Sequence, residues 1–487
     1  MTDYFKSSKE AFHKLWGDIK RLPKALQIGL FGVVLMYVGV AGMISADAPW
    51  LVRGDTVQHV DYVWRLHNGE IPKRSDGIQY PVFVEHAGVS KPQAASKNPP
   101  LFYAIHAPFV GSLLNSGHWQ LGIAVGRSIN IIIGILCILA LAWGGWLLGG
   151  KNRALHALAV PALTVLIYRF TRLNVDFALD NLLVLFATLS LIFSYKIIKQ
   201  GPSTQRIVIL ALLSIAGMYT KVSFIVFLAT NLLAIFLSVL VHSKQPWKDK
   251  LIKASIPALL VLVGVLVAVG WYYYIYDYKV SGNLYTARPD GVTGGRPVKS
   301  FQDVITSSDL WGLFYRNFTR SQVISAFIAG FSLAGVLTIV HKNRQKLLQN
   351  QIILLTICVM ALAVIGTFFV QMKHAVGIGS INFRYMLPVM LPFGLFLSYG
   401  LLYLKWTRGL IMAMVAIFMG LTSIGAYAAA NHAYFGSKIP DKLFGGMYTA
   451  GADNGVSAVV ITLLLLAFIA GSVMFARSVF KLSGSQK

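Results

Sequence analysis

Long apolar runs alternate with shorter polar segments along almost the whole chain, and this pattern predicts membrane-spanning helices. Most runs approach the roughly 20 residues that a helix needs to cross a bilayer. Helices are expected because lipid offers no partner to an unpaired backbone amide or carbonyl group. The fold class is predicted to be all-α, a polytopic transmembrane helix bundle with about twelve spans. We place them at 27–46, 120–149, 154–171, 177–198, 206–220, 222–242, 253–278, 323–341, 352–372, 385–404, 409–430 and 456–477.

The longest polar interval in this pattern, 47–119, follows the first predicted span directly. Its apolar stretch 101–114 is too short to span and is expected to lie at the membrane interface. We therefore predict a long first loop that carries short interfacial helices. Because this loop holds a large share of the acidic residues, we expect the chemistry of the protein there. Its acidic residues and histidines include Asp55, His59, Asp61, Glu70, Asp76, Glu85 and His86.

The charged residues support a membrane protein and predict its orientation across the membrane. Charged residues make up 13% of the 487 residues, about half of the roughly 25% that is usual in soluble proteins. The net charge of +25 does not indicate nucleic-acid binding, because the basic residues form short clusters between apolar runs. Such clusters are typical of loops that face the cytoplasm. Both termini are then predicted to be cytoplasmic and the first loop extracytoplasmic.

Three regions follow from this arrangement. Residues 1–26 form a basic, amphipathic cytoplasmic segment, and 27–404 form the main transmembrane module, with outer loops 47–119 and 279–322. Residues 405–487 contain the last spans and a short cytoplasmic tail. The first span lacks a clear small-residue cleavage site, so we expect it to be retained. Both cysteines, Cys137 and Cys358, lie in apolar runs, which implies no disulfide framework.

Three basic residues lie in or beside predicted spans. Arg127 lies inside one, Lys221 separates two, and Arg384 begins another. An ionisable group inside a membrane is costly and indicates function by default. The alternative is a side chain that reaches the headgroups from near a helix end. Both interpretations stay open for Lys221 and Arg384, and a functional role is favoured for Arg127.

The first loop also offers a metal interpretation. His59 follows Asp55 by four residues, one helical turn, so the two could bind a metal together. We prefer a surface histidine that orients Asp55. The chain has neither a His-Glu-x-x-His motif nor a cysteine cluster to support a dedicated zinc site.

Two further groups have both a structural and a functional interpretation. Asp176 and Asp180 share one helical face; they either pair with Arg169 or Arg172 and cap the bundle, or bind an acceptor. The run WYYYIYDYKV at 271–280 is typical of an aromatic belt at the membrane interface. Its tyrosines could also stack on sugars.

Several motifs occur in a characteristic order. They are GDTVQHVDY with Asp55, NGEIP, KNPPLFY, GRSIN with Arg127, RLNVDFALDNLLVLFATL with Asp176 and Asp180, AGMYTKVSF with Lys221, and NFRYMLP with Arg384 and Tyr385. This order, over about residues 30–400, resembles the GT-C superfamily of integral-membrane glycosyltransferases, which use polyprenyl-phosphate sugars. Its members include protein O-mannosyltransferases, the lipid A aminoarabinose transferase and mycobacterial arabinofuranosyltransferases. Several of these families have glutamate after the first-loop aspartate. Thr56 stands there in this chain, which weakens the case for a metal.

The resemblance implies an inverting transfer of sugar from a polyprenyl-phosphate-linked donor to a hydroxyl of a glycan, lipid or protein. Asp55 would be the general base, and a divalent metal at Asp55 and His59 stays open. Arg127, Lys221 and Arg384 would bind the donor phosphate. The supporting or acceptor-binding residues would be His59, Asp61, Asp176, Asp180 and Tyr385. The expected location is a bacterial cytoplasmic membrane, with the active site on its extracytoplasmic face.

Two other functions share parts of this pattern. About twelve spans with both termini inside also describe a secondary transporter, or a flippase of an anionic or lipid-linked substrate. Against it, the carboxylates concentrate in a loop, and no clear pair of broken helices stands out. A polysaccharide polymerase or ligase would need a large late outer loop, and 431–455 is small.

Overall fold

The computed structural model describes residues 22–50, 56–87, 93–279, 300–308, 322–378, 383–403, 408–435 and 449–484. Within these ranges the chain forms helices and no strands, which confirms the all-α prediction for the described part. Most of the predicted segment 1–26 and of the predicted loop 279–322 lies outside the described residues.

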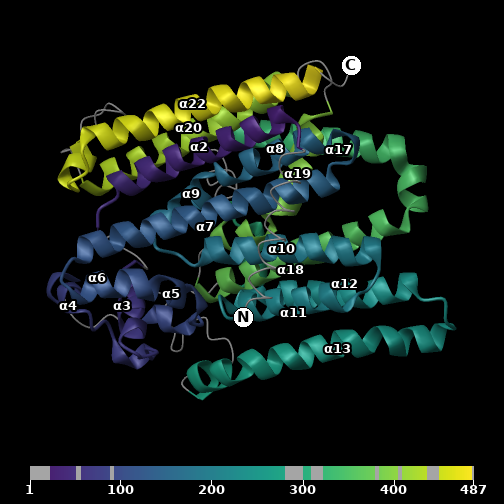
Figure 1. The fold of residues 1–487 in the computed structure, drawn as a ribbon, viewed down its shortest axis with the longest axis horizontal. Coiled ribbons are helices and arrows are strands. Elements are labelled where there is room, and N and C mark those ends of the chain that lie inside the picture. The colour runs from purple at the N-terminus through teal and green to yellow at the C-terminus, as the bar shows by residue number, and fades with distance from the viewer. Residues whose placement is uncertain are drawn as a thin grey trace, which may run out of the picture.

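Eight helices in the described part are long and apolar enough to cross a membrane, which fits a multi-pass membrane protein. In Figure 1 most of the long helices run roughly side by side along the long axis of the molecule. They are α2 (Lys24–Asp47), α7 (Trp119–Leu148), α10 (Asp180–Gln200), α12 (Ile225–His242), α13 (Trp247–Tyr272), α18 (Gln351–Ile378), α20 (Arg408–Phe435) and α22 (Ala458–Gly484).

The other four predicted spans also contain helices, but none of them qualifies alone as a span in the described part. They correspond to α8 (Arg153–Val165) with α9 (Tyr168–Val175), α11 (Thr204–Met218), α17 (Gln322–Gln349), and η7 (Phe383–Val389) with α19 (Met390–Leu401). The pair α8 and α9 is bent by 61° and could form a ninth, broken span. The larger number of about twelve stays a prediction.

Small residues allow the most extensive helix contact among the described helices, between α2 and α22 (Figure 1). A Cβ atom added to Gly32 would lie 2.8 Å from the carbonyl oxygen of Gly471. One added to Gly39 would lie 2.7 Å from the carbonyl oxygen of Leu464. Since lipid gives helices no hydrophobic reason to associate, close backbone packing of this kind is what holds membrane helices together. The first and last described spans are therefore locked together.

Residues 56–87 and 93–115 fold into short helices that gather at one end of the bundle, beside the start of α7 (Figure 1). The principal ones are α3 (Thr56–His67), α4 (Pro81–Ala87), α5 (Leu101–His106) and α6 (Ser112–Asn115), with a π-helical turn, η3 (Ala107–Gly111), between the last two. Their apolar side chains form a second hydrophobic core, which also includes Phe177, Leu179 and Leu182 from the start of α10 and the turn before it. The loop is thus packed onto the ends of the spans.

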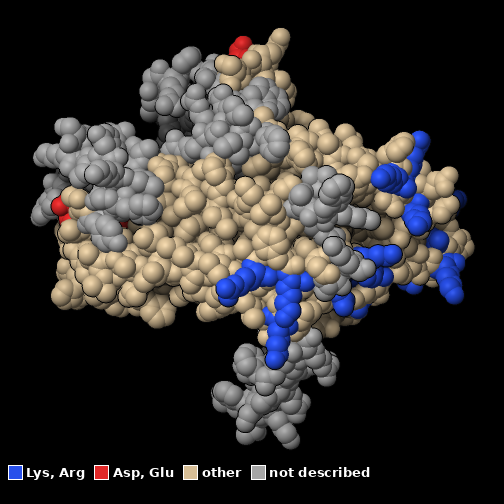
Figure 2. Space-filling model, turned by 90° about the horizontal axis from the view of Figure 1, so that it is seen from above, with Lys and Arg blue, Asp and Glu red and all other residues tan. Residues whose placement is uncertain are grey.

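Charge is unevenly distributed over the surface. Figure 2 shows lysine and arginine side chains gathered mainly toward one end of the visible face. The few acidic side chains on this face lie apart from them. A segregation of this kind is typical of a protein whose basic loops lie on one side of a membrane.

Candidate functional site

Asp55, the predicted base, lies outside the described residues, but the chain just before it is described. Arg127 on α7 donates hydrogen bonds to the carbonyl oxygens of Ser45 at 2.9 Å, Ala48 at 3.2 Å and Pro49 at 2.7 Å. Its guanidinium carbon lies 5.3 Å from the ring centroid of Trp50. A helix end leaves carbonyl groups without intrahelical partners. Arg127 therefore caps α2 and holds the segment that leads toward Asp55.

Asp180 and Lys221 form a buried ion pair beside the first loop. The Lys221 ammonium lies 2.7 Å from Asp180 Oδ1, and the two side chains are 10% and 3% exposed. Asp180 begins α10, where the positive end of the helix dipole favours a carboxylate. Lys221 lies in the turn between α11 and the 3-10 turn η5 (Val222–Phe224). The predicted alternative that Asp180 pairs with Arg169 or Arg172 is wrong in this respect, because its partner is Lys221.

Tyr385 and Arg384 complete this group from η7. The Lys221 ammonium lies 4.7 Å from the Tyr385 ring centroid, and the Arg384 guanidinium carbon lies 5.5 Å from it. The ring of His374 on α18 packs against Tyr385 at 4.1 Å between centroids. Arg384 is also near enough to Asp180 to interact with it electrostatically. The structure thus brings together four of the residues that the sequence singles out.

His59 joins the group from the first loop. Its Nδ1 atom lies 2.8 Å from Tyr103 Oη, the two rings stack, and it interacts electrostatically with Asp180. The preferred prediction of a surface histidine is wrong in one respect, because His59 is only 4% exposed. The proximity of Tyr103 leaves Nε2 as the ring nitrogen for a metal. Among the described residues, which exclude Asp55, no group of three or more His, Cys, Asp or Glu side chains could hold a metal ion.

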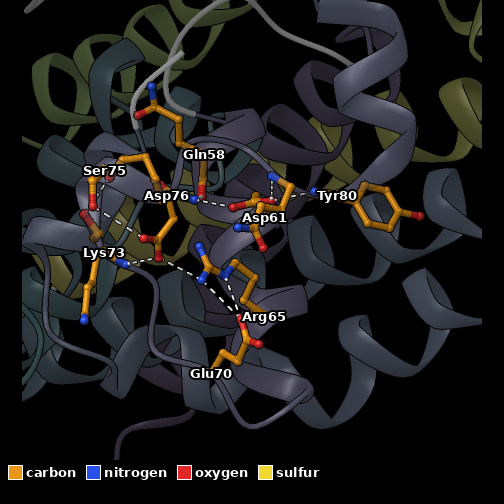
Figure 3. Close-up of polar contacts among 11 residues, drawn as sticks. Gln58, Asp61, Arg65, Glu70, Lys73, Ser75, Asp76 and Tyr80 are labelled. Carbon is orange, nitrogen blue, oxygen red and sulfur yellow. Dashed lines mark hydrogen bonds and ion pairs between the residues drawn. The ribbon is translucent and has the colours of Figure 1, made fainter. Parts of the chain in front are cut away.

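Asp61 lies in a different environment, inside the first loop (Figure 3). One carboxylate oxygen accepts hydrogen bonds from the backbone amides of Gln79 and Tyr80, both at 2.8 Å. The other accepts one from Gln93 Nε2 at 2.6 Å. Burial raises the pKa of Asp61, against the lowering effect of these bonds and of nearby Arg65. Asp61 therefore pins the returning loop onto α3.

Arg65, one helical turn further along α3, holds a second part of the same loop (Figure 3). Its Nη2 atom donates to Glu70 at 3.1 Å and to Asp76 at 2.8 Å. Burial raises the pKa of Asp76, but the Lys73 amide and the Arg65 guanidinium lower it more, so its pKa is below the usual value. These ion pairs keep the loop close to α3.

The turn before Asp180 carries a strained residue that the sequence did not reveal. Phe177 is the one described non-glycine residue with a positive φ angle, +54°. Side chains rarely adopt this region, and such strain clusters at functional sites. The ring is fully buried against Gly126, where any Cβ atom would overlap it, and lies 4.9 Å from the His106 ring centroid. The Phe177 ring thereby connects the turn that presents Asp180 to α7 and to the loop.

Asp176, on the other side of Phe177, forms an ion pair with Arg172 at 3.3 Å. This confirms the predicted pairing with Arg172, and acceptor binding by Asp176 stays a prediction. No signal in the sequence distinguishes it from Asp180. The prediction that both share one helical face is wrong, because Asp176 caps the end of α9 and Asp180 begins α10, with the turn at Phe177 between them. Lys221, 41 residues after Asp180, pairs with Asp180 and not with Asp176.

Two tyrosines of the aromatic run at 271–280 bind the first loop and the end of α11. Tyr272 donates to the carbonyl oxygens of Ser96 at 3.1 Å and Asn98 at 2.9 Å. Tyr273 donates to the Met218 carbonyl oxygen at 2.7 Å, just before the turn that holds Lys221. The hydroxyl groups of both tyrosines thus bind backbone rather than solvent.

An apolar cavity of about 340 Å³ lies close to Arg384 in the sequence. It is lined by Ile167 at the bend between α8 and α9, by Val364 of α18, and by apolar residues of 386–396. The lining residues Met386 and Leu387 belong to η7, the element that also carries Arg384.

No protein-family model and no curated protein matches the chain. Among solved structures, it is similar to ArnT from Cupriavidus metallidurans bound to undecaprenyl phosphate, with 14% identity over 92% of this chain and 77% of that chain, and a TM-score of 0.47. It is also similar to the archaeal oligosaccharyltransferase AglB from Archaeoglobus fulgidus in complex with an inhibitory peptide and a dolichol-phosphate. There the identity is 11% over 91% of this chain and 56% of that chain, with a TM-score of 0.45. Likenesses this distant do not assign a function to this chain.

Proposed function

We propose that the chain is an inverting membrane glycosyltransferase of the GT-C kind. It would move a sugar from a polyprenyl-phosphate-linked donor to a hydroxyl of a glycan, lipid or protein acceptor. We further propose a bacterial cytoplasmic membrane, with the site on its extracytoplasmic face. The observation that carries the proposal is the group of Lys221, Arg384 and Asp180. It places two cations with one carboxylate where the first loop packs onto the spans.

The two cations suit a departing phosphate. Groups already arranged around a developing charge stabilise the transition state without reorganising. Lys221 offers a compact point charge, and Arg384 offers a planar fork that matches phosphate oxygens. Asp180 would compensate the charge of Lys221 while no phosphate is bound. A phosphate with two negative charges would then bind between the two cations.

The apolar cavity suits the lipid part of such a donor. It is lined by apolar side chains, including Met386 and Leu387 of η7, the element that carries Arg384. With the phosphate at Arg384, the first isoprene units would occupy this cavity. The rest of the tail would extend into the surrounding lipid.

The proposed chemistry is a single displacement at the anomeric carbon. The acceptor oxygen attacks this carbon while its bond to the phosphate oxygen breaks, through an oxocarbenium-like transition state. The Asp55 carboxylate takes the hydroxyl proton, and the phosphate departs with the bonding electron pair. Arg127, whose phosphate-binding role stays untested, binds three carbonyl oxygens. We assign it the positioning of the segment that leads to Asp55.

A transporter or flippase is the second candidate, and one observation favours it. The helices α8 and α9 form a pair bent by 61°. Broken helices of this kind form the binding sites of many secondary transporters. A flippase for a lipid phosphate would use the same cations without transferring a sugar.

The test compares the native protein with Asp55→Asn in liposomes supplied with extracted polyprenyl-phosphate sugars. We expect the native protein to release polyprenyl phosphate and the variant to be slower by about 10²–10⁴-fold, because a general base contributes that much. Asp453→Asn removes an exposed carboxylate and is the matched control.

Other outcomes are equally informative. An Asp55→Asn variant that transfers as fast as the native protein would move the base to another residue. A native protein that moves labelled lipid phosphate across the bilayer and transfers no sugar would establish the second candidate instead.

A further inference from the structure

The end of the bundle away from the first loop is rich in lysine and arginine, as Figure 2 shows on one face. The basic residues cluster where α7 meets α8, α10 meets α11, α12 meets α13, and α17 meets α18. They are Lys151, Arg153, Lys196, Lys199, Arg206, Lys244, Lys248, Lys250, Lys253, Lys342, Arg344 and Lys346. Asp249 is the one acidic residue within these same junctions. The basic residues far outnumber the acidic ones within these junctions, which suits the binding of anions from outside the chain.

Two of these cations are held over tryptophan rings of α7. The Lys196 ammonium lies 5.2 Å from the Trp143 ring centroid and 5.0 Å from that of Phe193. The Arg153 guanidinium carbon lies 4.2 Å from the Trp146 ring centroid. Trp143 and Trp146 are three residues apart, so they are neighbours on one helix face. The fold thus places cations from two helices, α10 and α8, at neighbouring points along α7.

Neither cation has an acidic partner in the described part of the chain. The ion pairs there involve Arg65, Arg172 and Lys221, and neither Lys196 nor Arg153 makes a hydrogen bond to a described residue. A ring covers only one side of a cation. The N–H groups on the other side, from the three of an ammonium and the five of a guanidinium, remain available to an anion.

The same face of α7 continues as an exposed apolar stripe. Ile132, Leu136 and Leu139 are 57%, 45% and 50% exposed. With Trp143 and Trp146 they follow the spacing 4, 3, 4, 3, which lines up side chains along one side of a helix. Tryptophan prefers the depth of the lipid headgroups. The apolar residues of the stripe therefore lie at the depth of the acyl chains, and the two tryptophan rings lie at the depth of the headgroups. Beyond the rings lie Lys196 and Arg153, which have no acidic partner among the described residues.

We propose that this face of α7, with Lys196 and Arg153, is a binding site for one anionic phospholipid. Its acyl chains lie along Ile132, Leu136 and Leu139, and its phosphodiester binds the two cations. A free phosphate would use the cations alone, so the stripe favours a lipid. The site lies at the opposite end of the bundle from Lys221 and Arg384 and does not depend on the proposed glycosyl transfer.

The test measures binding of phosphatidylglycerol to the purified full chain, with phosphatidylcholine as reference, by native mass spectrometry. Lys196→Gln with Arg153→Gln removes both cations. Each basic residue near an anionic surface contributes about a fivefold gain in binding. We therefore expect about 30-fold weaker binding of phosphatidylglycerol and no change for phosphatidylcholine.

The matched control, Lys244→Gln with Lys248→Gln, removes the same charge from exposed positions of the basic end. We expect it to weaken binding less than about fivefold. An equal loss in both double variants would indicate diffuse attraction and overturn the site, as would no loss in either. Displacement of the lipid by inorganic phosphate would also overturn it, because the stripe would then contribute nothing.

A variant that keeps both charges guards against misfolding. Lys196→Arg with Arg153→Lys preserves two cations at the same positions, and we expect it to bind phosphatidylglycerol within about threefold of the native protein. A 30-fold loss in this variant as well would show that charge at these positions is not what binds the lipid.

Discussion

Asp61 and Asp180 are both buried carboxylates, yet their partners differ. Asp61 is surrounded by neutral donors, which are two backbone amides and the side-chain amide of Gln93. Asp180 faces the ammonium of Lys221, with Arg384 nearby. Asp61 accepts three hydrogen bonds from neutral groups and is fully buried, so it is closed to a ligand. The neighbours of Asp180 are cations, which are the groups that bind a phosphate.

The ion pairs of the two regions repeat this contrast. In the first loop, Arg65 binds two carboxylates, Glu70 and Asp76. At the ends of the spans, two cations share Asp180. Two carboxylates on one arginine fix the loop in place, whereas two cations beside one carboxylate form a group that suits phosphate binding. The comparison therefore separates a structural carboxylate from one that belongs to a binding site.

Among these variants, loss of Lys221 is expected to lower the free energy of unfolding most. Lys221→Gln leaves Asp180 buried without its cation, and breaking a buried pair this way costs about 3–5 kcal/mol. Thermal unfolding in detergent would measure the loss. Adding Asp180→Asn removes the unpaired charge and should restore most of the stability but not the activity. If the double variant transferred sugar normally, Lys221 would have no part in the reaction.

Asp61→Asn should have a smaller effect, limited to stability. The new amide nitrogen would face Gln93 Nε2, so a buried donor meets a donor, at a cost of about 1–3 kcal/mol. Hydrogen exchange of residues 77–98 should rise, while binding of polyprenyl phosphate stays near the native level. If Asp61→Asn showed the hydrogen exchange of the native protein but no longer bound polyprenyl phosphate, Asp61 would belong to the binding site, as Asp180 does.

Gly126→Ala tests whether the Phe177 ring positions Asp180. A methyl group there overlaps the ring, and overpacking costs about 1–3 kcal/mol. We expect kcat to fall with little change in KM for the donor, and Phe177→Leu in the same chain to recover part of kcat. Equal kcat in the native protein and Gly126→Ala would mean that this contact does not orient Asp180.

The smallest expected effect concerns pH. The folded pKa of Asp76 is lowered, so its contribution to stability is present above its unfolded pKa of about 4 and is lost as pH falls through the folded pKa. The folded pKa of Asp61 is raised, so Asp61 stabilises the fold more as pH falls. Proteolysis of the first loop should rise at low pH, and Asp76→Asn should abolish that rise. An unchanged acid response in Asp76→Asn would assign it to other carboxylates.

Apolar runs in the sequence predicted where helices lie, because a bilayer imposes both length and composition. The bend at Leu166 and Ile167 escaped prediction, since neither residue is a helix breaker. Lys221 and Arg384 were predicted from the cost of charge near a membrane. The pairing of Lys221 with Asp180 was not, because it depends on how α10 and α11 pack. The burial of His59 likewise depends on Tyr103, which belongs to another helix.

Binding of polyprenyl phosphate to folded Lys221→Gln and Asp180→Asn variants tests the central claim most directly. The account predicts that Lys221→Gln binds about 10–100-fold more weakly than the native protein, the loss of a charge-assisted bond of about 1.5–3 kcal/mol. Asp180→Asn, which frees the ammonium from its carboxylate, should bind at least as tightly as the native protein. Native affinity in Lys221→Gln, or a loss in Asp180→Asn as large as in Lys221→Gln, would contradict the claim that these cations bind the donor phosphate.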